Sequence, residues 1–205
     1  MGFYTDVIIP IFYDTSMDSS KINEGRKSIL NKITEEEILE IGFGTGINVK
    51  FYPENVKKII GIDINRGMLK QFNKKKLNSK IEIQSLHQDG EKLPFPDDSI
   101  SGVSSTYTLC TIRNIDTALS EIYRVMKPGG KYYFLEHGLA DKPNIQKWQH
   151  RLNPIQKIWA GGCNLNRDIR SLITNAGFEI TELNNYYMQR DPKIVGYMYE
   201  GIATK

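Results

Sequence analysis

The sequence predicts an α/β fold: five parallel-type strands flanked by helices, followed by a C-terminal antiparallel hairpin. Short apolar runs alternate with helical stretches through most of the chain, which is typical of a parallel sheet with helices on its faces. The last two extended runs are separated only by Gln189-Arg190-Asp191-Pro192. A connection that short suits a hairpin, because a parallel crossover needs about a dozen residues. No repeat or long linker divides the 205 residues, so we predict one domain.

The parallel strands are predicted from five short apolar runs, each bounded by polar residues, glycine or proline. They span residues 37–41, 58–62, 81–86, 100–104 and 131–135. Between them, apolar residues at helical spacing predict helices over residues 47–51, 68–77 and 115–125. The third helix is predicted to end at Met126-Lys127-Pro128-Gly129-Gly130, since proline cannot continue the hydrogen-bond ladder and the glycines permit a turn.

The C-terminal third departs from this alternation. Residues 141–166 contain both tryptophans and two prolines, and we interpret them as an insertion rather than as a regular element. A helix is predicted over residues 167–176, where Gly177 stops it. The hairpin strands are predicted over residues 178–187 and 194–203.

Composition excludes several classes of protein. With 205 residues, of which 40% are hydrophobic, folding can bury roughly 70% of the unfolded surface without help from disulfides or metals. No apolar run approaches the ~20 residues of a membrane-spanning helix, so we expect no integral membrane segment and no signal peptide. Cys110 and Cys163 form no CxxC pair, which favours a reducing, cytoplasmic setting. A formal charge of +3 is too small to indicate nucleic acid and favours a small-molecule partner.

A glycine-rich turn follows the first predicted strand. Gly42, Gly44 and Gly46 lie between that strand and the next helical stretch. Glycines there allow a sharp turn and a close approach of a ligand to the backbone. The spacing GxGxG brings the third glycine one residue earlier than in the dinucleotide fingerprint, which disfavours a nicotinamide cofactor. A tight strand-to-helix turn without a ligand is the alternative interpretation.

Two carboxylates follow the next two strands. Asp63 comes after the second strand, about 20 residues beyond the first glycine, where a carboxylate meets the ribose hydroxyls of an adenosine ligand. Asp89 follows the third strand and is suited to accept a hydrogen bond from the exocyclic amine of adenine. A helix cap at Asp63 and an ordinary turn aspartate at Asp89 are the alternatives.

Four motifs in order resemble the class I S-adenosylmethionine-dependent methyltransferases. The resemblance spans nearly the whole chain and is closest to the small-molecule "type 11" branch that includes quinone-biosynthesis C-methyltransferases. The motifs are Leu39-Glu40-Ile41-Gly42-Phe43-Gly44-Thr45-Gly46, Gly61-Ile62-Asp63, the run from Asp89 to Ser99 with its LPFPD segment, and Val125-Met126-Lys127-Pro128-Gly129-Gly130.

The resemblance implies a Rossmann-like, seven-stranded, mostly parallel sheet with S-adenosyl-L-methionine bound across its carboxyl edge. Its last strand would insert antiparallel beside the fifth. By similarity, the loop of Gly42, Phe43, Gly44 and Gly46 packs against the methionine moiety, and Glu40 orients that loop and the amino group. The resemblance further assigns Asp63 to the ribose, Ile64 to the adenine face, Asp89 and Gly90 to the adenine edge and Thr106 to the sulfonium, with Asn48 among the cofactor-binding residues.

The sequence departs from the family pattern at two places. Ser101 stands where family members often carry Asp or Glu, and Ser105-Thr106-Tyr107 replaces the Asn-Pro-Pro-Tyr type of motif. The second departure argues against methylation of nucleic-acid bases. The C-terminal third resembles the thiol methyltransferase branch and its quinone and phospholipid methyltransferase relatives. That resemblance rests on Leu135-Glu136-His137-Gly138, Trp148-Gln149, Asn153-Pro154 and Gly162-Cys163-Asn164-Leu165.

Acceptor-side residues are predicted from position. His137 ends the fifth strand and is the candidate general base, with a structural histidine as the alternative. Tyr13 belongs to an aromatic N-terminal segment that often forms a lid over the cofactor in the family that this chain resembles, with a helix packed on the sheet edge as the alternative. Trp148 and Trp159 are candidates for an apolar acceptor pocket or for ordinary core. Cys110, expected in a helical segment after the fourth strand, is interpreted as a core residue. Cys163 is interpreted as a packing residue, with a nucleophile or an arsenic ligand as the alternative.

The sequence therefore predicts one methyltransferase domain of three parts. Residues 1–33 would form the helical lid, 34–136 the cofactor-binding core, and 137–205 the acceptor-side insertion and hairpin. The expected reaction is methyl transfer to a small apolar acceptor: a thiol, a quinone precursor or a lipid amine. The alternatives are an NAD(P)-dependent oxidoreductase and a non-catalytic S-adenosylmethionine-binding module.

Overall fold

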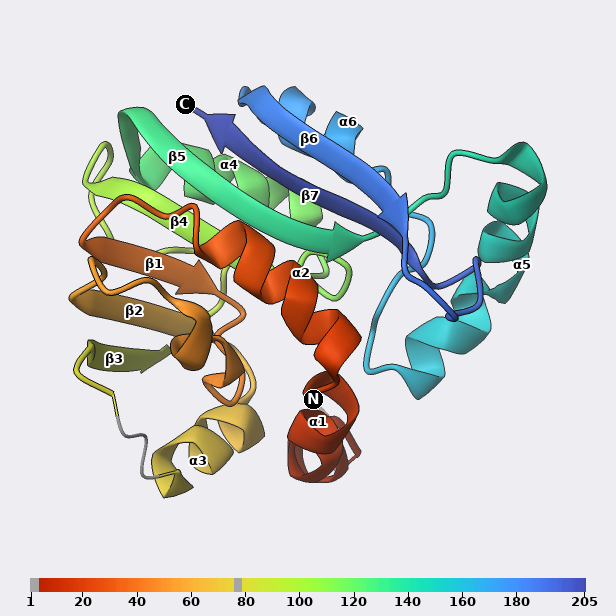
Figure 1. Ribbon diagram of the computed structural model, residues 1–205, viewed down its shortest axis with the longest axis horizontal. Coiled ribbons are helices and arrows are strands. Elements are labelled where there is room, and N and C mark those ends of the chain that lie inside the picture. Colours follow the sequence, from red (N-terminus) through yellow and green to blue (C-terminus); the bar gives the residue numbers. More distant parts are fainter. Residues whose placement is uncertain (1–3, 76–78) are drawn as a thin grey trace.

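A single seven-stranded sheet organises the computed structural model, which describes residues 4–75 and 79–205 (Figure 1). The strand order is β3-β2-β1-β4-β5-β7-β6. Strands β1 to β5 pair in parallel, and β7 pairs antiparallel with both β5 and β6. The strands are β1 (Glu37–Ile41), β2 (Lys58–Asp63), β3 (Glu82–His87), β4 (Ile100–Thr106), β5 (Met126–His137), β6 (Glu179–Tyr187) and β7 (Tyr197–Thr204). This arrangement confirms the predicted fold class.

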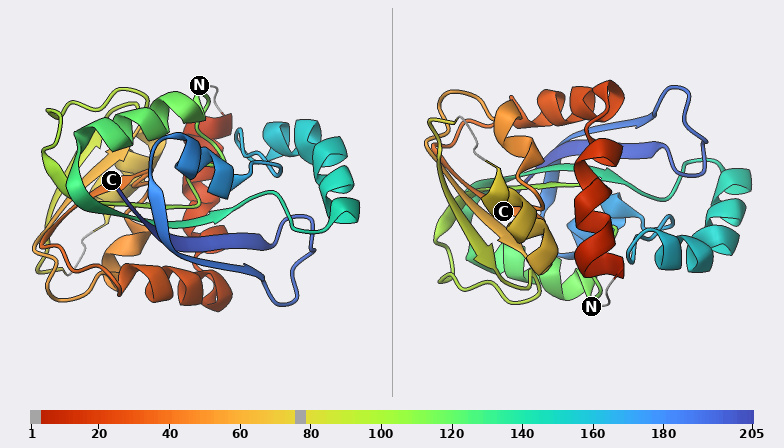
Figure 2. Two further views of the ribbon diagram at one scale, coloured as in Figure 1. Left: turned by 90° about the horizontal axis from the view of Figure 1, so that it is seen from above. Right: turned by 90° about the horizontal axis from the view of Figure 1, so that it is seen from below.

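Helices cover both faces of the sheet (Figure 2). Helices α4 and α6 contact each other on one face, and α2 packs against β5 and β7 on the other. The helical elements are η1 (Tyr4–Ile8), α1 (Ile9–Met17), α2 (Ser20–Leu30), η2 (Ile47–Phe51), α3 (Arg66–Lys74), α4 (Ile115–Val125), α5 (Pro143–Trp159) and α6 (Ile169–Asn175).

Two hydrophobic cores lie on the two faces of the sheet. Because successive strand residues point to opposite faces, Ile38 belongs to one core and Leu39 to the other. Tyr133 and Tyr132 divide between the cores in the same way. This double burial explains why the central strands read as continuous apolar runs, which is typical of parallel sheets. Because β1 to β5 pair in parallel, all five present their carboxyl ends at one edge of the sheet.

The insertion after β5 differs most from the sequence prediction. Residues 143–159 of the predicted insertion form the long helix α5, although Pro154 lies inside it. Proline removes one helical hydrogen bond and is expected to break a helix, but here the helix continues through it. Figure 1 shows α5 standing away from the sheet, at the end to which the arrows of the parallel strands point.

Four smaller differences concern single elements or their ends. Residues 47–51 form only a short 3-10 turn, and Cys110, expected in a helical segment, lies in a turn. Strand β5 begins at Met126, because Met126 pairs with Ile100 before the chain passes through the predicted turn. Helix α3 ends at Lys74, and residues 76 and 77 of its predicted range lie outside the described residues.

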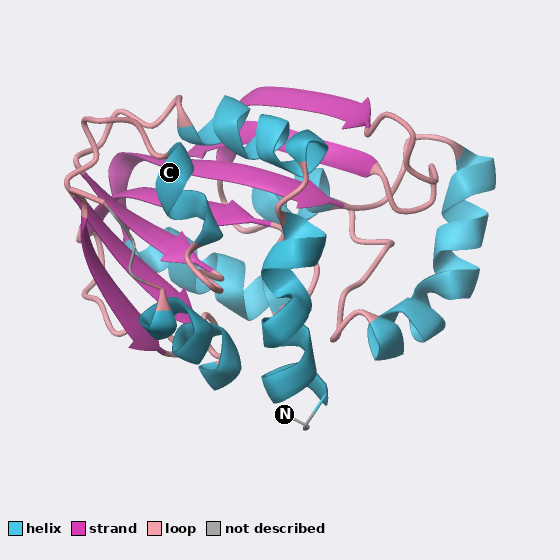
Figure 3. Ribbon diagram, turned by 60° about the horizontal axis from the view of Figure 1, so that its bottom comes forward, coloured by secondary structure: helices cyan, strands magenta, loops and turns pink. Residues whose placement is uncertain are grey.

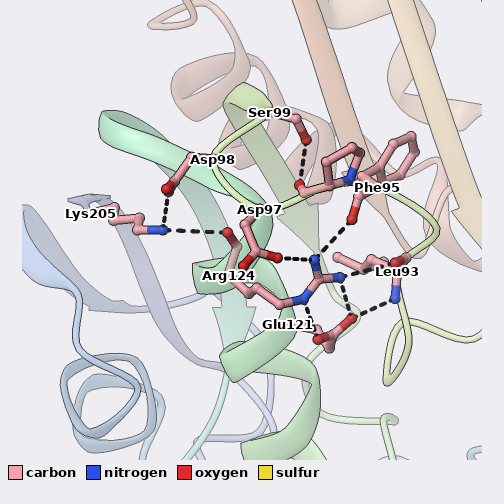
Figure 4. Close-up of polar contacts among 9 residues, drawn as sticks. Leu93, Phe95, Asp97, Asp98, Ser99, Glu121, Arg124 and Lys205 are labelled. Carbon is pink, nitrogen blue, oxygen red and sulfur yellow. Dashed lines mark hydrogen bonds and ion pairs between the residues drawn. The ribbon is translucent and has the colours of Figure 1, made fainter.

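A single arginine fastens the LPFPD loop to α4 (Figure 4). The Arg124 Nη1 donates to the Phe95 carbonyl at 2.9 Å and to the Asp97 carboxylate at 2.7 Å. Its Nη2 donates to the Leu93 carbonyl at 3.1 Å, and its Nε donates to Glu121 at 2.7 Å. The LPFPD motif is therefore held in place by an arginine that lies outside the motif, on α4.

Replacement of Arg124 by alanine is expected to lower the free energy of unfolding by about 2 kcal/mol, because two loop carbonyls and two carboxylates lose their donor. Lysine at this position should recover less than half of that loss, since an ammonium cannot reproduce the planar fork. Chemical denaturation of both variants measures the effect. Lys127→Ala, at an exposed position near the start of β5, serves as the control, and an Arg124→Ala chain as stable as this control would contradict the expectation.

Candidate functional site

The carboxyl ends of the parallel strands form one wall of a cavity. Residues after β1, β2 and β3 line it together with the loop after β4, the N-terminal segment and the residues that follow α5. Open α/β sheets bind their ligands at this edge. The predicted site residues that line the cavity are Tyr13, Gly42, Gly44, Asp63, Ile64, Asp89 and Gly90.

The glycine loop has a backbone that only glycine adopts easily. Gly42, Gly44 and Gly46 have φ values of 75°, 58° and 71°. A Cβ at Gly42 would lie 2.1 Å from the Thr108 Oγ1, and one at Gly46 would lie 2.7 Å from the Phe72 ring. Gly44 has more space, because the nearest atom to its added Cβ is 3.7 Å away, on Tyr13. Packing therefore requires Gly42 and Gly46, whereas Gly44 is the glycine that leaves room beside the cavity.

Asp63 lies at the end of β2 and joins the glycine loop to the start of α3. Its Oδ2 accepts from the Gly44 N–H at 2.8 Å, and its Oδ1 accepts from the Asn65 N–H at 2.7 Å. Burial raises the pKa of this carboxyl, while these two backbone donors act in the opposite direction. Each carboxylate oxygen retains further acceptor capacity, so Asp63 is able to bind hydroxyl groups of a ligand in the cavity.

The N-terminal segment closes over the glycine loop. Figure 3 shows it beside the carboxyl ends of the strands. The Asp14 carboxylate pairs with Lys75 of the α3 end at 2.5 Å and accepts from the Thr45 hydroxyl. Asn65, which caps α3, donates to the Thr5 carbonyl at 2.9 Å. These contacts hold the N-terminal segment against the loop after β1 and the start of α3, and Tyr13 of this segment lines the cavity.

A buried polar network lies behind the glycine loop. Glu40 is 1% exposed, and its carboxylate accepts from Asn48 Nδ2 at 2.6 Å and from the Tyr52 hydroxyl at 2.8 Å. Asn48 also donates to the Thr106 Oγ1 at 2.9 Å. Glu40, Asn48 and Thr106 therefore lie together, although they are not among the residues that line the cavity. Phe43 is likewise buried, with its ring 4.8 Å from that of Phe72.

Glu40 is expected to make stability depend on pH. Burial raises its pKa from 4.5 to about 7 despite the hydrogen bonds from Tyr52 and Asn48. Between these two values the folded chain binds more protons than the unfolded chain, so this contribution to stability is present below pH 4.5 and disappears as the pH rises through 7. Relative to Glu40→Gln, the wild type should lose up to about 3 kcal/mol over that interval.

Denaturant unfolding of the wild type and Glu40→Gln, measured between pH 5 and pH 8, tests this expectation. The difference between the two chains isolates Glu40, because the other titrating groups occur in both. A difference that stays constant with pH would show that the Glu40 carboxyl titrates near its ordinary pKa.

The remaining predicted residues lie away from the cavity lining. Trp148 is 52% exposed and Trp159 is 72% exposed, both on α5. The carbonyl of Trp159 accepts from the Tyr4 hydroxyl at 2.9 Å, which joins the end of α5 to the N-terminal segment. Neither tryptophan belongs to a buried core, so the interpretation as ordinary core is wrong. Ala160 and Gly161, which follow Trp159 directly, do line the cavity.

His137 ends β5, as the sequence predicts, but it faces a sulfur atom. Its Nε2 is 3.0 Å from the Cys163 Sγ, and it is not among the residues that line the cavity. Burial acts to lower the pKa of His137, but the hydrogen bond to Cys163 and the charge of that residue outweigh burial and raise it. Cys163 itself is 8% exposed.

The sequence analysis missed two residues that shape the loop after β4. Glu136 is fully buried, and its carboxylate accepts from the Thr108 N–H at 2.9 Å and from the Ser105 hydroxyl at 2.9 Å. Tyr107 has a φ of 54°, which is rare outside glycine, and it lines the cavity. An acidic residue inside an apolar strand was the available signal for Glu136. For Tyr107 it was an aromatic residue directly after a buried strand.

Comparison with known proteins assigns this arrangement to a family. Residues 39–134 match the sequence model of a protein family that is described as a methyltransferase domain. A thiol S-methyltransferase from Homo sapiens is 32% identical over 176 residues, which are 82% of this chain and 70% of that protein. The chain belongs to the class I S-adenosylmethionine-dependent methyltransferases. The recognition from sequence motifs is thereby confirmed, as is the prediction of an enzyme.

Other methyltransferases match over different parts of the chain. A demethylmenaquinone methyltransferase from Symbiobacterium thermophilum is 36% identical over 113 residues, which are 53% of this chain and 44% of that protein. Among solved structures, an S-adenosylmethionine-dependent methyltransferase from Mesorhizobium loti has a TM-score of 0.69 at 14% identity and covers 92% of this chain and 100% of that one. This structural similarity supports the fold. Among the described residues, none of the helices combines the length and apolar character that crossing a membrane requires.

Three buried polar atoms without hydrogen-bond partners indicate whether the site suits the cofactor of this methyltransferase family. Arg26 is fully buried, and its Nε and Nη2 have no hydrogen-bond partner among the described residues; neither does Asn48 Oδ1. The Arg26 guanidinium lies 5.1 Å from the centre of the Tyr107 ring, which lines the cavity. A guanidinium suits a carboxylate and a carbonyl oxygen suits an ammonium. By this chemistry the residues present suit an ionic amino-acid group and a ribose, and neither Arg26 nor Asn48 is among the residues that line the cavity.

Proposed function

We propose that this enzyme transfers a methyl group from S-adenosylmethionine to a small apolar acceptor, and that this acceptor is a thiol. The observation that carries the proposal is the extent of the similarity to the human thiol S-methyltransferase, which covers 82% of the chain. The quinone-type relatives match 53% to 61% of it. The C-terminal part, where an acceptor-specific region is expected, thus contributes to the thiol match.

In this proposal the cavity residues hold the cofactor. Asp63 accepts hydrogen bonds from the ribose hydroxyls, while Ile64, Asp89 and Gly90 contact the adenine. Gly42 and Gly44 leave space for the methionine moiety, and Arg26 and Asn48 bind its carboxylate and ammonium. Glu40 and Thr106 act through Asn48, whose side chain they fix. Phe43 and Gly46 support the loop by packing.

Several of the remaining lining residues suit an apolar acceptor. Ile9, Tyr13 and Tyr107 contribute apolar surface to the cavity, and Ala160 and Gly161 enter it from the end of α5. Trp148 and Trp159 stay predicted acceptor-binding residues. Both are exposed on α5, so they would contact an acceptor at the outer surface of the protein. When bound, S-adenosylmethionine supplies a methyl group already activated on its sulfonium. The protein then mainly has to align the acceptor and exclude water, which can contribute roughly 7–11 kcal/mol.

Arg26 provides a sharp test of how the cofactor is oriented. Replacement by methionine keeps the length and apolar part of the side chain but removes the guanidinium. We expect Arg26→Met to weaken the binding of S-adenosylhomocysteine by at least about tenfold, since a charge-assisted hydrogen bond contributes about 1.5–3 kcal/mol. Methylthioadenosine lacks the amino-acid end, so its affinity should stay the same. Equal losses for both ligands in isothermal titration would contradict this orientation.

Release of S-adenosylhomocysteine with different acceptors tests the proposed function. The full chain is incubated with S-adenosylmethionine and matched alkyl thiols, quinols and amines, and the product is quantified by mass spectrometry. We expect turnover with apolar thiols and a methyl thioether as the second product. Turnover confined to quinols or amines would overturn the thiol assignment and retain a methyltransferase. His137 as a general base stays a prediction from sequence, which a changed pH–rate profile of His137→Gln would support.

A further inference from the structure

Three side chains with soft or borderline metal-ligand atoms meet at one point of the fold. Cys110 comes from the turn after β4, His137 from the end of β5, and Cys163 from the loop after α5. Their ligand atoms all lie within 4.8 Å of one another, and the His137 Nε2 is 3.0 Å from the Cys163 Sγ. This cluster could not be predicted from the sequence, because the two cysteines are far apart in the chain.

Hydrogen bonds fix the segments that carry the cysteines. The Asn164 backbone N–H donates to the Cys110 carbonyl at 2.9 Å, and its side-chain amide donates to the same carbonyl at 2.8 Å. Arg167 donates to the carbonyls of Leu109 and Ile112, on either side of Cys110. The loop after β4 and the loop after α5 are therefore joined where the two sulfur atoms approach each other, and the ligand atoms are held in place before any ion arrives.

The environment suits a cation that binds thiolates. Cys110 is 2% exposed and Cys163 is 8% exposed, so water does not compete strongly for either sulfur. Two sulfurs and one imidazole nitrogen are a donor set typical of Zn²⁺.

We propose that Cys110, His137 and Cys163 bind a divalent thiophilic cation of the Zn²⁺ type, with three protein ligands and a fourth position left for a small exogenous ligand. The three ligands come from three different segments, so the ion would link the loop after β4, the end of β5 and the loop after α5. The first and third of these also contribute Thr111 and Gly161 to the cavity lining. The site does not rest on the proposed function, since it concerns metal binding alone.

Cobalt substitution tests the proposal directly. The full chain is reduced, freed of metal with a chelator, checked for two free thiols, and titrated with Co²⁺ without oxygen. We expect a thiolate-to-cobalt charge-transfer band and strong visible bands of a tetrahedral site, saturating at one ion per chain and disappearing when Zn²⁺ is added. A titration of the folded, reduced chain without a charge-transfer band would overturn the proposal.

Ligand variants assign the bands to this cluster. Cys163→Ser and Cys110→Ser should each lose most of the charge-transfer intensity, and His137→Gln should shift the visible bands. His150→Gln, an exposed histidine on α5, is the matched control and should behave like the wild type. A charge-transfer band of unchanged intensity in Cys163→Ser would contradict the site.

Thermal melting separates metal binding from a folding defect. Zn²⁺ should raise the melting temperature of the wild type and of His150→Gln, because an ion that binds only the folded chain stabilises it. Cys163→Ser should melt near the metal-free wild type and show no such increase. If Cys110→Ser does not fold, because its side chain is the more buried, Cys163→Ser alone decides the question. An equal increase in the wild type and in folded Cys163→Ser would overturn the proposal.

Discussion

Replacement of Asp63 by alanine is expected to weaken binding of S-adenosylhomocysteine by about 100-fold or more. A carboxylate that accepts from two ribose hydroxyls contributes about 1.5–3 kcal/mol for each hydrogen bond, and this substitution removes both. It also leaves the Gly44 and Asn65 N–H groups without their acceptor, which loosens the loop. Isothermal titration measures the loss.

Two further variants make this result specific. Asp63→Asn keeps the size of the side chain but replaces one acceptor oxygen by a donor group, so its affinity should lie between those of the wild type and Asp63→Ala. Asp116→Ala, an exposed aspartate in the first turn of α4, should bind like the wild type. Unchanged affinity in a folded Asp63→Ala chain would remove Asp63 from the ribose site. In the wild type, S-adenosylhomocysteine and not NAD should raise the melting temperature.

Gly42→Ala is expected to lower the free energy of unfolding by about 3 kcal/mol. The left-handed backbone costs an alanine about 1–2 kcal/mol, and the overlap with Thr108 adds a further cost of about 1–3 kcal/mol. Urea or thermal unfolding monitored by circular dichroism measures the change. Cofactor affinity should fall as well, since Gly42 and Thr108 both line the cavity.

Gly129→Ala separates the two contributions. Gly129 has nearly the same φ, 77° against 75°, but an added Cβ there meets nothing within 4 Å. Gly129→Ala should therefore lower the free energy of unfolding by only about 1 kcal/mol, which comes from the backbone alone. Thr108→Ala combined with Gly42→Ala should recover part of the difference, because it removes the two closest atoms. Equal losses for Gly42→Ala and Gly129→Ala would show that the packing against Thr108 is unimportant.

Local pattern was sufficient for the parts of the fold that are built from neighbouring residues. The buried strands read directly as apolar runs, and the glycine loop and Asp63 follow their strands at short range, so their positions on one edge could be predicted. Helix α4 was predicted with its observed ends, because its apolar spacing is regular and proline follows soon after it. These features depend on a few adjacent residues and on the known direction of parallel strands.

Features that depend on distant contacts could not be predicted. Helix α5 tolerates Pro154, and no local rule indicates that tolerance. Arg124 reaches three loop residues from a different element, and Cys110 meets Cys163 only because Asn164 joins their two segments. His137 was located correctly at the strand end, but its partner lies in a loop whose path the sequence does not specify.

A crystal structure of the chain with S-adenosylhomocysteine tests the central claim most directly. The account predicts that both ribose hydroxyls lie within hydrogen-bond distance of the Asp63 carboxylate. It also predicts the amino-acid end beside Arg26 and Asn48, with Tyr13 closing the cavity. Ligand density outside this edge of the sheet, or a ribose directed away from Asp63, would contradict it.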